Sequence, residues 1–220
     1  MTANLKAVLN EAKKLATPSK AEEVKVNSVV KDILARITNE ITKQKLNAKV
    51  VVGGSVAKGT WLPGISDIDF FLVFDYDDFS DRSAEISNFA EKVLKKVFRN
   101  LQMLHGSRDY FAIKHDNYNL EVVPVLNISN GQQARNITDY SPLHVKYVNK
   151  NVNIKDDVRL AKQFMKAAGV YGAESYVNGF SGHVIEILSI HYGGFVKLLN
   201  HALGWGGKEF IDVERHYKNK

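Results

Sequence analysis

Asp67 and Asp69 stand two residues apart, directly before the apolar run Phe70–Phe74. Side chains at positions i and i+2 of a β-strand point to the same face, so the two carboxylates can aim at one point. Carboxylates that converge repel each other unless a cation lies between them, and Mg²⁺ prefers such oxygen ligands together with substrate phosphates. By itself, Asp-x-Asp is more often a turn residue followed by a solvent-facing strand residue.

The residues before the aspartates indicate a phosphate-binding turn. Gly53, Gly54 and Ser55 lie between a predicted strand and a predicted helix start. Backbone N–H groups at such a turn, together with the Ser55 hydroxyl, can hold phosphate oxygens, and Lys58 can add a positive charge. A phosphate cradle about a dozen residues ahead of a metal site is much more specific than either feature alone.

A third carboxylate is needed to complete a two-metal phosphoryl-transfer site, and it typically comes from a neighbouring strand. Glu121 is the best candidate, because it is an acid at the mouth of the otherwise apolar segment LEVVPVL.

The composition restricts the class of protein. The 220 residues contain no cysteine, which excludes disulfides and thiolate metal sites and weakly favours an intracellular protein. No apolar run has the length of a membrane span and the N-terminus is not a signal peptide, so we expect a cytoplasmic protein without membrane contact. The net charge of +6 favours a polyanionic partner, although a solvated basic surface would give the same value.

The remaining pattern predicts the elements that position these residues. We expect helices over 4–16, from the capping box of Ser19 and Glu22 to residue 41, and over 81–101. We expect strands over 49–52, 69–74, 110–114 and 120–126, with a hairpin at Asp116-Asn117. From Ser141 the pattern is helical to the end, after a polar connection over 127–139. The expected fold class is α+β, with a mixed-sheet domain over 1–130 that includes the N-terminal helices and an all-helical domain over 131–220.

The segment GSVAKGTWLPGISDIDFFLVF resembles the signature of nucleotidyltransferases of the polymerase-beta type. The GTWLPG part is most similar to the archaeal (class I) CCA-adding tRNA nucleotidyltransferases. Three further segments resemble that family, and the resemblance extends from about Thr17 to Val213: LEVVPVL, SPLHVKYV and DDVRLAKQFMKAAGVYGAESYVNGFSGHVIEILSIHYGGF.

The resemblance implies a palm domain, then a helical nucleotide-binding domain, and nucleotidyl transfer from CTP and ATP to the 3′-hydroxyl of tRNA or another RNA. It implies that Asp67, Asp69 and Glu121 hold Mg²⁺ or Mn²⁺; a homo-oligomer is left open. The substrate-binding residues that it implies are Gly54, Ser55, Lys58, His115, Ser141, His144, Lys162 and Tyr171. Without the family, a structural role is the favoured interpretation: Lys162 as a solvated helix residue, Tyr171 as a packed aromatic, and His115 and His144 as structural histidines.

His183 and Glu186 form an H-x-x-E pattern on a predicted helix. We reject a metal site there, because no third ligand shares that face of the helix and the resemblance makes this helix a packing element.

Three features depart from the family pattern. Glu121 stands where an Asp is usual, Lys58 stands where an Arg is usual, and the chain ends at Lys220, before the body and tail domains that grip tRNA in longer members. Two other functions therefore stay open. One is a tRNA-independent synthesis of oligoadenylate or cyclic nucleotides, and the other is an RNA-binding relative whose catalytic site has decayed.

Overall fold

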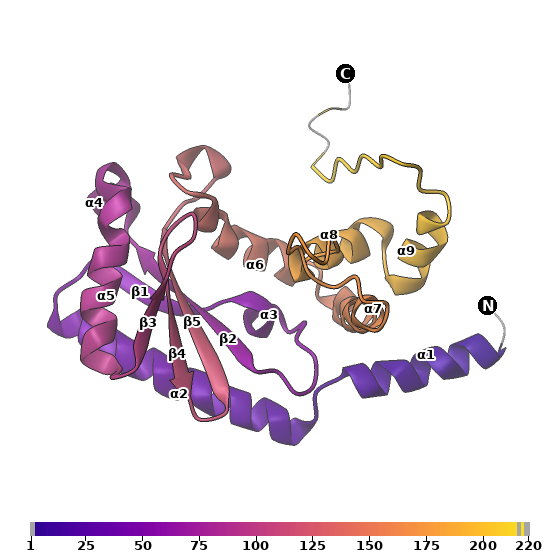
Figure 1. Cartoon of the computed structure of the whole chain (residues 1–220), viewed down its shortest axis with the longest axis horizontal. Coiled ribbons are helices and arrows are strands. Elements are labelled where there is room, and N and C mark those ends of the chain that lie inside the picture. Colours follow the sequence, from indigo (N-terminus) through magenta and orange to yellow (C-terminus); the bar gives the residue numbers. More distant parts are fainter. Residues whose placement is uncertain (1–2, 215–216, 218–220) are drawn as a thin grey trace. The chain divides into compact units, whose positions relative to one another are not determined.

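The structure is a computed structural model that describes residues 3–214 and 217, and the chain forms two compact units (Figure 1). One unit comprises residues 18–147, and the other joins residues 1–17 to residues 148–220. The compact units thus differ in extent from the predicted domains over 1–130 and 131–220, which remain a prediction. The first unit contains α2 (Lys20–Lys43), β1 (Ala48–Val52), α3 (Gly54–Lys58), β2 (Asp67–Phe74), α4 (Tyr76–Phe79), α5 (Ile86–Val97), β3 (Leu101–Leu104), β4 (Tyr110–His115), β5 (Tyr118–Leu126) and most of α6 (Ser141–Asn149).

The first unit is built on one five-stranded sheet with the order β1-β2-β5-β4-β3. The central pair β2 and β5 is parallel, and every other pair is antiparallel. The sheet is therefore mixed, as predicted, and the α+β class is confirmed. The predicted hairpin is also confirmed, because His115 pairs with Tyr118 across a two-residue turn in which Asp116 has a φ of 52°.

One face of the sheet carries the main hydrophobic core. Alternate residues of β2 (Ile68, Phe70, Leu72 and Phe74) are fully buried there, and they pack with the apolar sides of α2 and α5 (Figure 1). Fully burying such a side chain contributes about 1.5–3 kcal/mol. This burial fixes the direction of the strand, so the intervening residues of β2 must point to the opposite face.

The opposite face of the sheet is covered only in part. Phe71, Val73 and Val125 form a small buried cluster on which Val145 of α6 packs. The same row of side chains begins with the two aspartates of β2, where the burial pattern changes from exposed to buried along the strand. Helix α6 therefore covers the apolar end of this face.

The second unit is helical in its regular elements. It contains α1 (Ala3–Ala16), α7 (Lys155–Ala167), α8 (Gly182–Tyr192) and α9 (Phe195–Ala202). Asp157 of α7 connects three of them: it accepts a hydrogen bond from the Phe195 backbone at 3.1 Å and lies 3.8 Å from the Lys13 ammonium. No helix in the described part of the chain combines the length and the apolar character that crossing a membrane requires.

The predicted helix over 81–101 is wrong at both ends. Residues 80–85 form a 3₁₀ turn that is interrupted at Arg82, whose φ of −122° and ψ of 34° are not helical. The α-helix ends at Val97 because buried Phe98 is extended, and the edge strand β3 follows. The strand was missed because the burial of its four residues does not alternate, so no period-two signal exists.

The prediction of helix from Ser141 to the end is also wrong in two places. Residues 168–181 contain no helix and include an isolated bridge between Tyr171 and Phe180. Gly169 and Gly172 have φ values of +70° and +129°, which end the helical path. Helix is likewise absent from the described residues after Ala202.

The capping box at the start of α2 is confirmed and has a second role. The Ser19 hydroxyl accepts a hydrogen bond from the Glu22 backbone, and the Glu22 carboxylate accepts one from the Ser19 backbone. The other Glu22 oxygen accepts a hydrogen bond from the Gly64 backbone at 2.9 Å. These hydrogen bonds lower the pKa of Glu22 below its ordinary value. The Gly64 N–H has the largest effect, and the Ser19 N–H the next largest. Glu22 therefore ties the loop before β2 to the start of α2.

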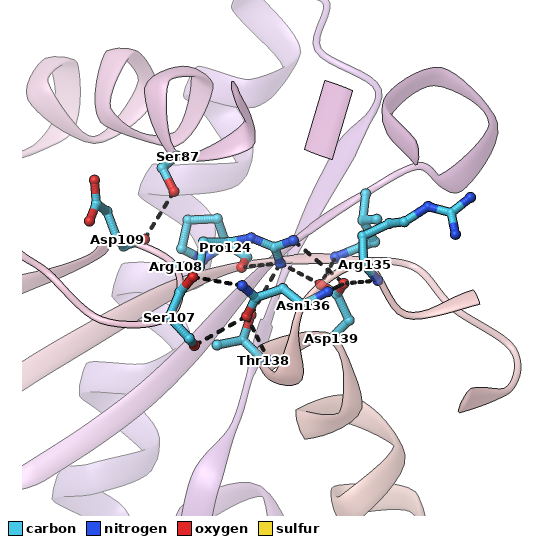
Figure 2. Close-up of polar contacts among 10 residues, drawn as sticks. Ser87, Ser107, Arg108, Asp109, Pro124, Arg135, Asn136, Thr138 and Asp139 are labelled. Carbon is cyan, nitrogen blue, oxygen red and sulfur yellow. Dashed lines mark hydrogen bonds and ion pairs between the residues drawn. The ribbon is translucent and has the colours of Figure 1, made fainter. Parts of the chain in front are cut away.

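A buried polar network lies beside the end of β5 (Figure 2). The Arg108 guanidinium forms an ion pair with fully buried Asp139 and donates to the Pro124 carbonyl at 3.2 Å. Asp139 also accepts from the backbone N–H groups of Leu126, Arg135 and Asn136 at 2.9–3.0 Å. The network fixes the β3–β4 turn and the polar connection after β5 to each other.

We expect Asp139→Ala to destabilise the protein by roughly 3–5 kcal/mol, because it leaves the Arg108 charge buried and unpaired. Urea unfolding measures this. The double variant Arg108→Met/Asp139→Leu should recover only the part of the loss that comes from the unpaired charge, because three backbone N–H groups still lose the Asp139 acceptor. A cost below about 1 kcal/mol for the single variant would contradict the role of the pair.

Glu22 should make stability depend on pH in the acidic range. Its pKa is lowered by folding, so its contribution is present above the ordinary value of 4.5 and is lost as the pH falls through the folded value. Wild type should therefore exceed Glu22→Gln in Tm at about pH 7, and the difference should shrink as the pH falls below 4.5. A Tm difference that stays constant over this range would contradict the account.

Candidate active site

The parallel pairing of β2 with β5 brings the predicted carboxylates together. Asp69 is the register partner of Glu121, and Asp67 is the partner of Asn119. All four residues lie on the sheet face opposite the main core, because their neighbours Ile68 and Leu120 are fully buried in it. The structure thus places an acid from each of two central strands side by side, at the edge where both strands begin.

Asp67 is held by its neighbours. Its Oδ1 atom accepts a hydrogen bond from the Asn119 side chain at 2.9 Å, and its Oδ2 atom accepts one from the Ser66 hydroxyl at 2.8 Å. These bonds fix the orientation of the most exposed of the three carboxylates. Asn119 was not predicted as a site residue, although its place opposite Asp67 follows once the register is known.

Glu121 is the carboxylate of the cluster whose pKa is raised. Its partial burial raises its pKa above the ordinary value, and the negative charges of Asp69 and then Asp67 raise it further. Such a group is stabilised in its charged form by a nearby cation. The pKa direction therefore agrees with the prediction that this cluster serves a positive ion.

The Gly-Gly-Ser turn lies against Asp69. The Gly53 N–H donates to the Asp69 carbonyl at 2.7 Å, and a Cβ atom on Gly53 would lie 2.7 Å from the Phe71 ring. A Cβ on Gly54 would lie 1.5 Å from Asp69 Oδ2, and Gly54 has a φ of +53°. Only glycine fits there, so the start of α3 comes directly against the Asp69 carboxylate.

Ser55 and Lys58 are both on the short helix α3, which ends at Gly59 in a left-handed conformation. Ser55 is partly exposed, whereas Lys58 is buried with 8% of its surface exposed. Thr60 and Trp61 then bury their side chains and anchor the GTWLPG loop. The loop thus acts as a support for the turn and the carboxylates.

Ser141 and His144 lie one turn apart at the start of α6. The His144 ring stacks on Tyr140, with centroids 6.4 Å apart. Because Val145 packs on Phe71 and Val73, α6 is on the same sheet face as the carboxylates.

His115 lies on the sheet face opposite the carboxylates. It follows Lys114 in β4, and Lys114 is the register partner of Asn119. Alternation along the strand therefore puts Lys114 on the carboxylate face and His115 with Ile113 on the core face.

Lys162 and Tyr171 belong to the other unit. The Lys162 ammonium is buried and forms an ion pair with Glu186 at 2.8 Å. A Cβ on Gly182 would lie 3.0 Å from the Tyr171 hydroxyl and 3.7 Å from the Lys162 nitrogen, so the two predicted residues are close to each other. Glu186, which the sequence analysis assigned to a packing helix, is therefore in contact with a predicted site residue.

A cavity of about 480 Å³ adjoins the carboxylates on the side away from the Gly-Gly-Ser turn. Its polar lining comes from Asp67, Asn100, Gln102, Lys114, Asn119 and Glu121. The sequence analysis missed Asn100, Gln102 and Lys114. The hairpin at Asp116-Asn117 was the available signal for Lys114, because it sets the register that puts Lys114 beside Asn119.

The residues present fit a divalent cation. Asp69 and Glu121 offer oxygen ligands, which hard cations such as Mg²⁺ prefer. Because Gly54 has no side chain, the Asp69 carboxylate can lie directly against the Gly-Gly-Ser turn. Among the described residues, no three His, Cys, Asp or Glu side chains stand close enough together to hold an ion as they are. The Asp67 carboxylate instead accepts hydrogen bonds from the side chains of Ser66 and Asn119.

Two family profiles match the chain. The family described as "Nucleotidyltransferase domain" matches residues 34–144, and "tRNA nucleotidyltransferase, second domain" matches residues 156–220.

Curated relatives are similar over most of the chain. The CCA-adding enzyme of Nanoarchaeum equitans is 43% identical over 171 residues, which are 77% of this chain and 42% of the relative. That of Pyrobaculum islandicum is 38% identical over 207 residues, which are 91% of this chain and 48% of the relative. The chain spans about half the length of the curated relatives that it matches.

Solved structures share the fold at low sequence identity. The RNA terminal uridylyl transferase Cid1 has a TM-score of 0.63 at 14% identity, over 87% of this chain and 53% of Cid1. CdnC of E. coli MS115-1 has a TM-score of 0.62 at 18% identity, over 90% of this chain and 69% of CdnC. With residues 34–144 matched by the family profile, and with the resemblance to the archaeal CCA-adding enzymes confirmed, the chain belongs to the nucleotidyltransferase family.

Proposed function

We propose that this chain transfers nucleotides from CTP and ATP to the 3′-hydroxyl of tRNA and thereby adds or repairs its CCA end. The observation that carries the proposal is the register of β2 and β5, which sets Asp69 beside Glu121 while the Gly54 turn lies against Asp69. The similarity to CCA-adding enzymes supports the choice of tRNA, CTP and ATP.

The residues divide the chemistry between them. The N–H groups at the start of α3 and the Ser55 hydroxyl bind phosphate oxygens, and Lys58 contributes charge. Nucleotidyltransferases of this family use divalent metal ions, and here we propose Mg²⁺, with Mn²⁺ as a substitute, held by Asp67, Asp69 and Glu121. In the proposed reaction the RNA 3′-hydroxyl attacks the α-phosphorus of the nucleoside triphosphate, and pyrophosphate leaves. Bound ions would lower the pKa of that hydroxyl and neutralise charge on the phosphates. The chain itself mainly positions the two substrates.

Further residues complete the proposed nucleotide site. By the family resemblance, we propose that Ser141, His144, Lys162 and Tyr171 also bind the nucleotide. His115 remains a prediction of the resemblance alone, because it shares the core face of β4 rather than the face of the carboxylates.

The acceptor RNA would approach from the other side of the carboxylates. The Gly-Gly-Ser turn follows β1, which lies on one side of β2, whereas the cavity that Lys114, Asn100 and Gln102 help to line lies over β3, β4 and β5 on the other. Lys114 at its wall offers a cation for an RNA phosphate, and Asn100 and Gln102 offer amide groups for the terminal nucleotide. We place the protein in the cytoplasm with its tRNA substrate, and a homo-oligomer stays open.

An incorporation assay tests the proposed function. Each nucleoside triphosphate is supplied separately with Mg²⁺ or Mn²⁺, with and without tRNA that ends before its CCA. We expect addition of C and A that requires tRNA and is lost in Asp69→Ala. Product without tRNA would instead support a synthase of oligoadenylate or cyclic nucleotides, and a folded protein that adds neither nucleotide would contradict the proposal.

Gly54→Ala should lower transfer activity by about two orders of magnitude or more, because its Cβ would displace the Asp69 carboxylate. Gly64→Ala is the matched control: its φ is +71°, but a Cβ there has no neighbour within 4 Å. Steady-state kinetics compare the two variants. Equal activity in both would contradict the role of the close approach at Gly54.

Lys114→Ala should raise the KM for tRNA and leave the KM for CTP unchanged. If Lys114 contacts one phosphate, the slope of log K against log salt should fall by about one. Lys31→Ala, which removes an exposed charge from α2, is the control. A Lys114 variant that binds tRNA like the control would exclude the cavity as the acceptor side.

A further inference from the structure

Glu186 is a charged residue in an otherwise apolar helix segment, and the proposed function gives it no role. It is fully buried, and its Oε1 atom accepts a hydrogen bond from the Lys162 ammonium of α7 at 2.8 Å. Lys162 itself is only 3% exposed. Replacing a buried ion pair by apolar residues is often neutral or stabilising, so the fold alone does not explain why this pair is charged.

The position of the pair suggests a reason. Gly182 begins α8, and Glu186 lies one turn later on the same side of the helix. A Cβ on Gly182 would lie 3.7 Å from the Lys162 nitrogen and 3.0 Å from the Tyr171 hydroxyl. The Lys162 ammonium is therefore next to both Glu186 and the hydroxyl of the second residue that we propose for nucleotide binding in this unit.

A lysine side chain has four flexible carbons and loses about 2 kcal/mol of rotamer entropy when it is fixed. If a partner fixes it before the ligand arrives, this cost does not reduce the affinity for the ligand. An ammonium carries three donors, so one bond to a carboxylate is compatible with bonds to phosphate oxygens.

We infer that Glu186 is a positioning residue that holds the Lys162 ammonium beside the Tyr171 hydroxyl, ready for the phosphates of the nucleotide. This inference rests on the proposed function, which gives Lys162 its phosphate contact. The other carboxylate oxygen of Glu186 lies 3.8 Å from His183 Nδ1. In this inference Glu186 does not touch the nucleotide and acts on it through Lys162.

The test compares nucleotide affinity with stability in the whole chain. In Glu186→Gln we expect the Kd for ATP with Mg²⁺, and the KM for CTP, to rise about tenfold, while the KM for tRNA stays unchanged. Ser189→Ala changes another fully buried polar residue of α8 and should leave the Kd for ATP unchanged. An unchanged Kd in the folded Glu186→Gln protein would overturn the inference.

A double variant tests whether the fold needs the charged pair and whether nucleotide binding needs Lys162. Lys162→Met/Glu186→Leu replaces the pair by apolar residues and should unfold in urea at about the wild-type concentration. We expect its Kd for ATP to stay at least tenfold above wild type. A double variant that is stable and binds ATP like wild type would show that nucleotide binding does not need Lys162 or Glu186, and would overturn the inference.

The two proposals fail in different ways. If wild type transfers nucleotides and the Glu186 variants bind ATP normally, the positioning role is wrong and the proposed function stands. If wild type binds ATP, loses that affinity in Glu186→Gln and transfers nothing to tRNA, the proposed reaction is wrong and the positioning role stands.

Discussion

The parallel pairing of β2 with β5 is the constraint on which the catalytic proposal depends. It is the only parallel pair in the described sheet, and it makes two strands begin at the same edge. A shift of one residue in this register would move Glu121 to the core face and bury its charge among apolar side chains. The hydrophobic row of β2 and β5 therefore fixes the place of the carboxylates, so the core and the site are specified together.

The site combines a charge repulsion with a close backbone approach. Asp69 and Glu121 lie side by side on neighbouring strands; partial burial raises the pKa of Glu121, and the negative charges of Asp69 and then Asp67 raise it further. The Gly54 backbone then occupies the space in which any other residue would push Asp69 away. A bound cation would relieve the repulsion between the carboxylates, and a raised carboxylate pKa beside a glycine turn is more typical of a functional site than of a structural cluster.

Sequence reasoning succeeded where the signal was local. The capping box at Ser19, the hairpin at Asp116-Asn117 and the strand–turn–helix around Gly54 depend on short-range chemistry, and all three are present. It failed at β3, an edge strand without alternating burial, and in the glycine-containing segment after α7, which interrupts the expected helix. It also missed the contact of Lys162 with Glu186, because the two residues are 24 positions apart and meet only through helix packing.

The central claim is that Asp69 and Glu121 act as one cation site. The most direct measurement is Mn²⁺ affinity, followed by electron paramagnetic resonance in the presence of a non-hydrolysable CTP analogue, in wild type, Asp69→Asn, Glu121→Gln and the double variant. Two ligands of one ion should be strongly coupled, so each single variant should lose nearly as much affinity as the double variant. Losses that simply add, or no loss in Glu121→Gln, would contradict the claim.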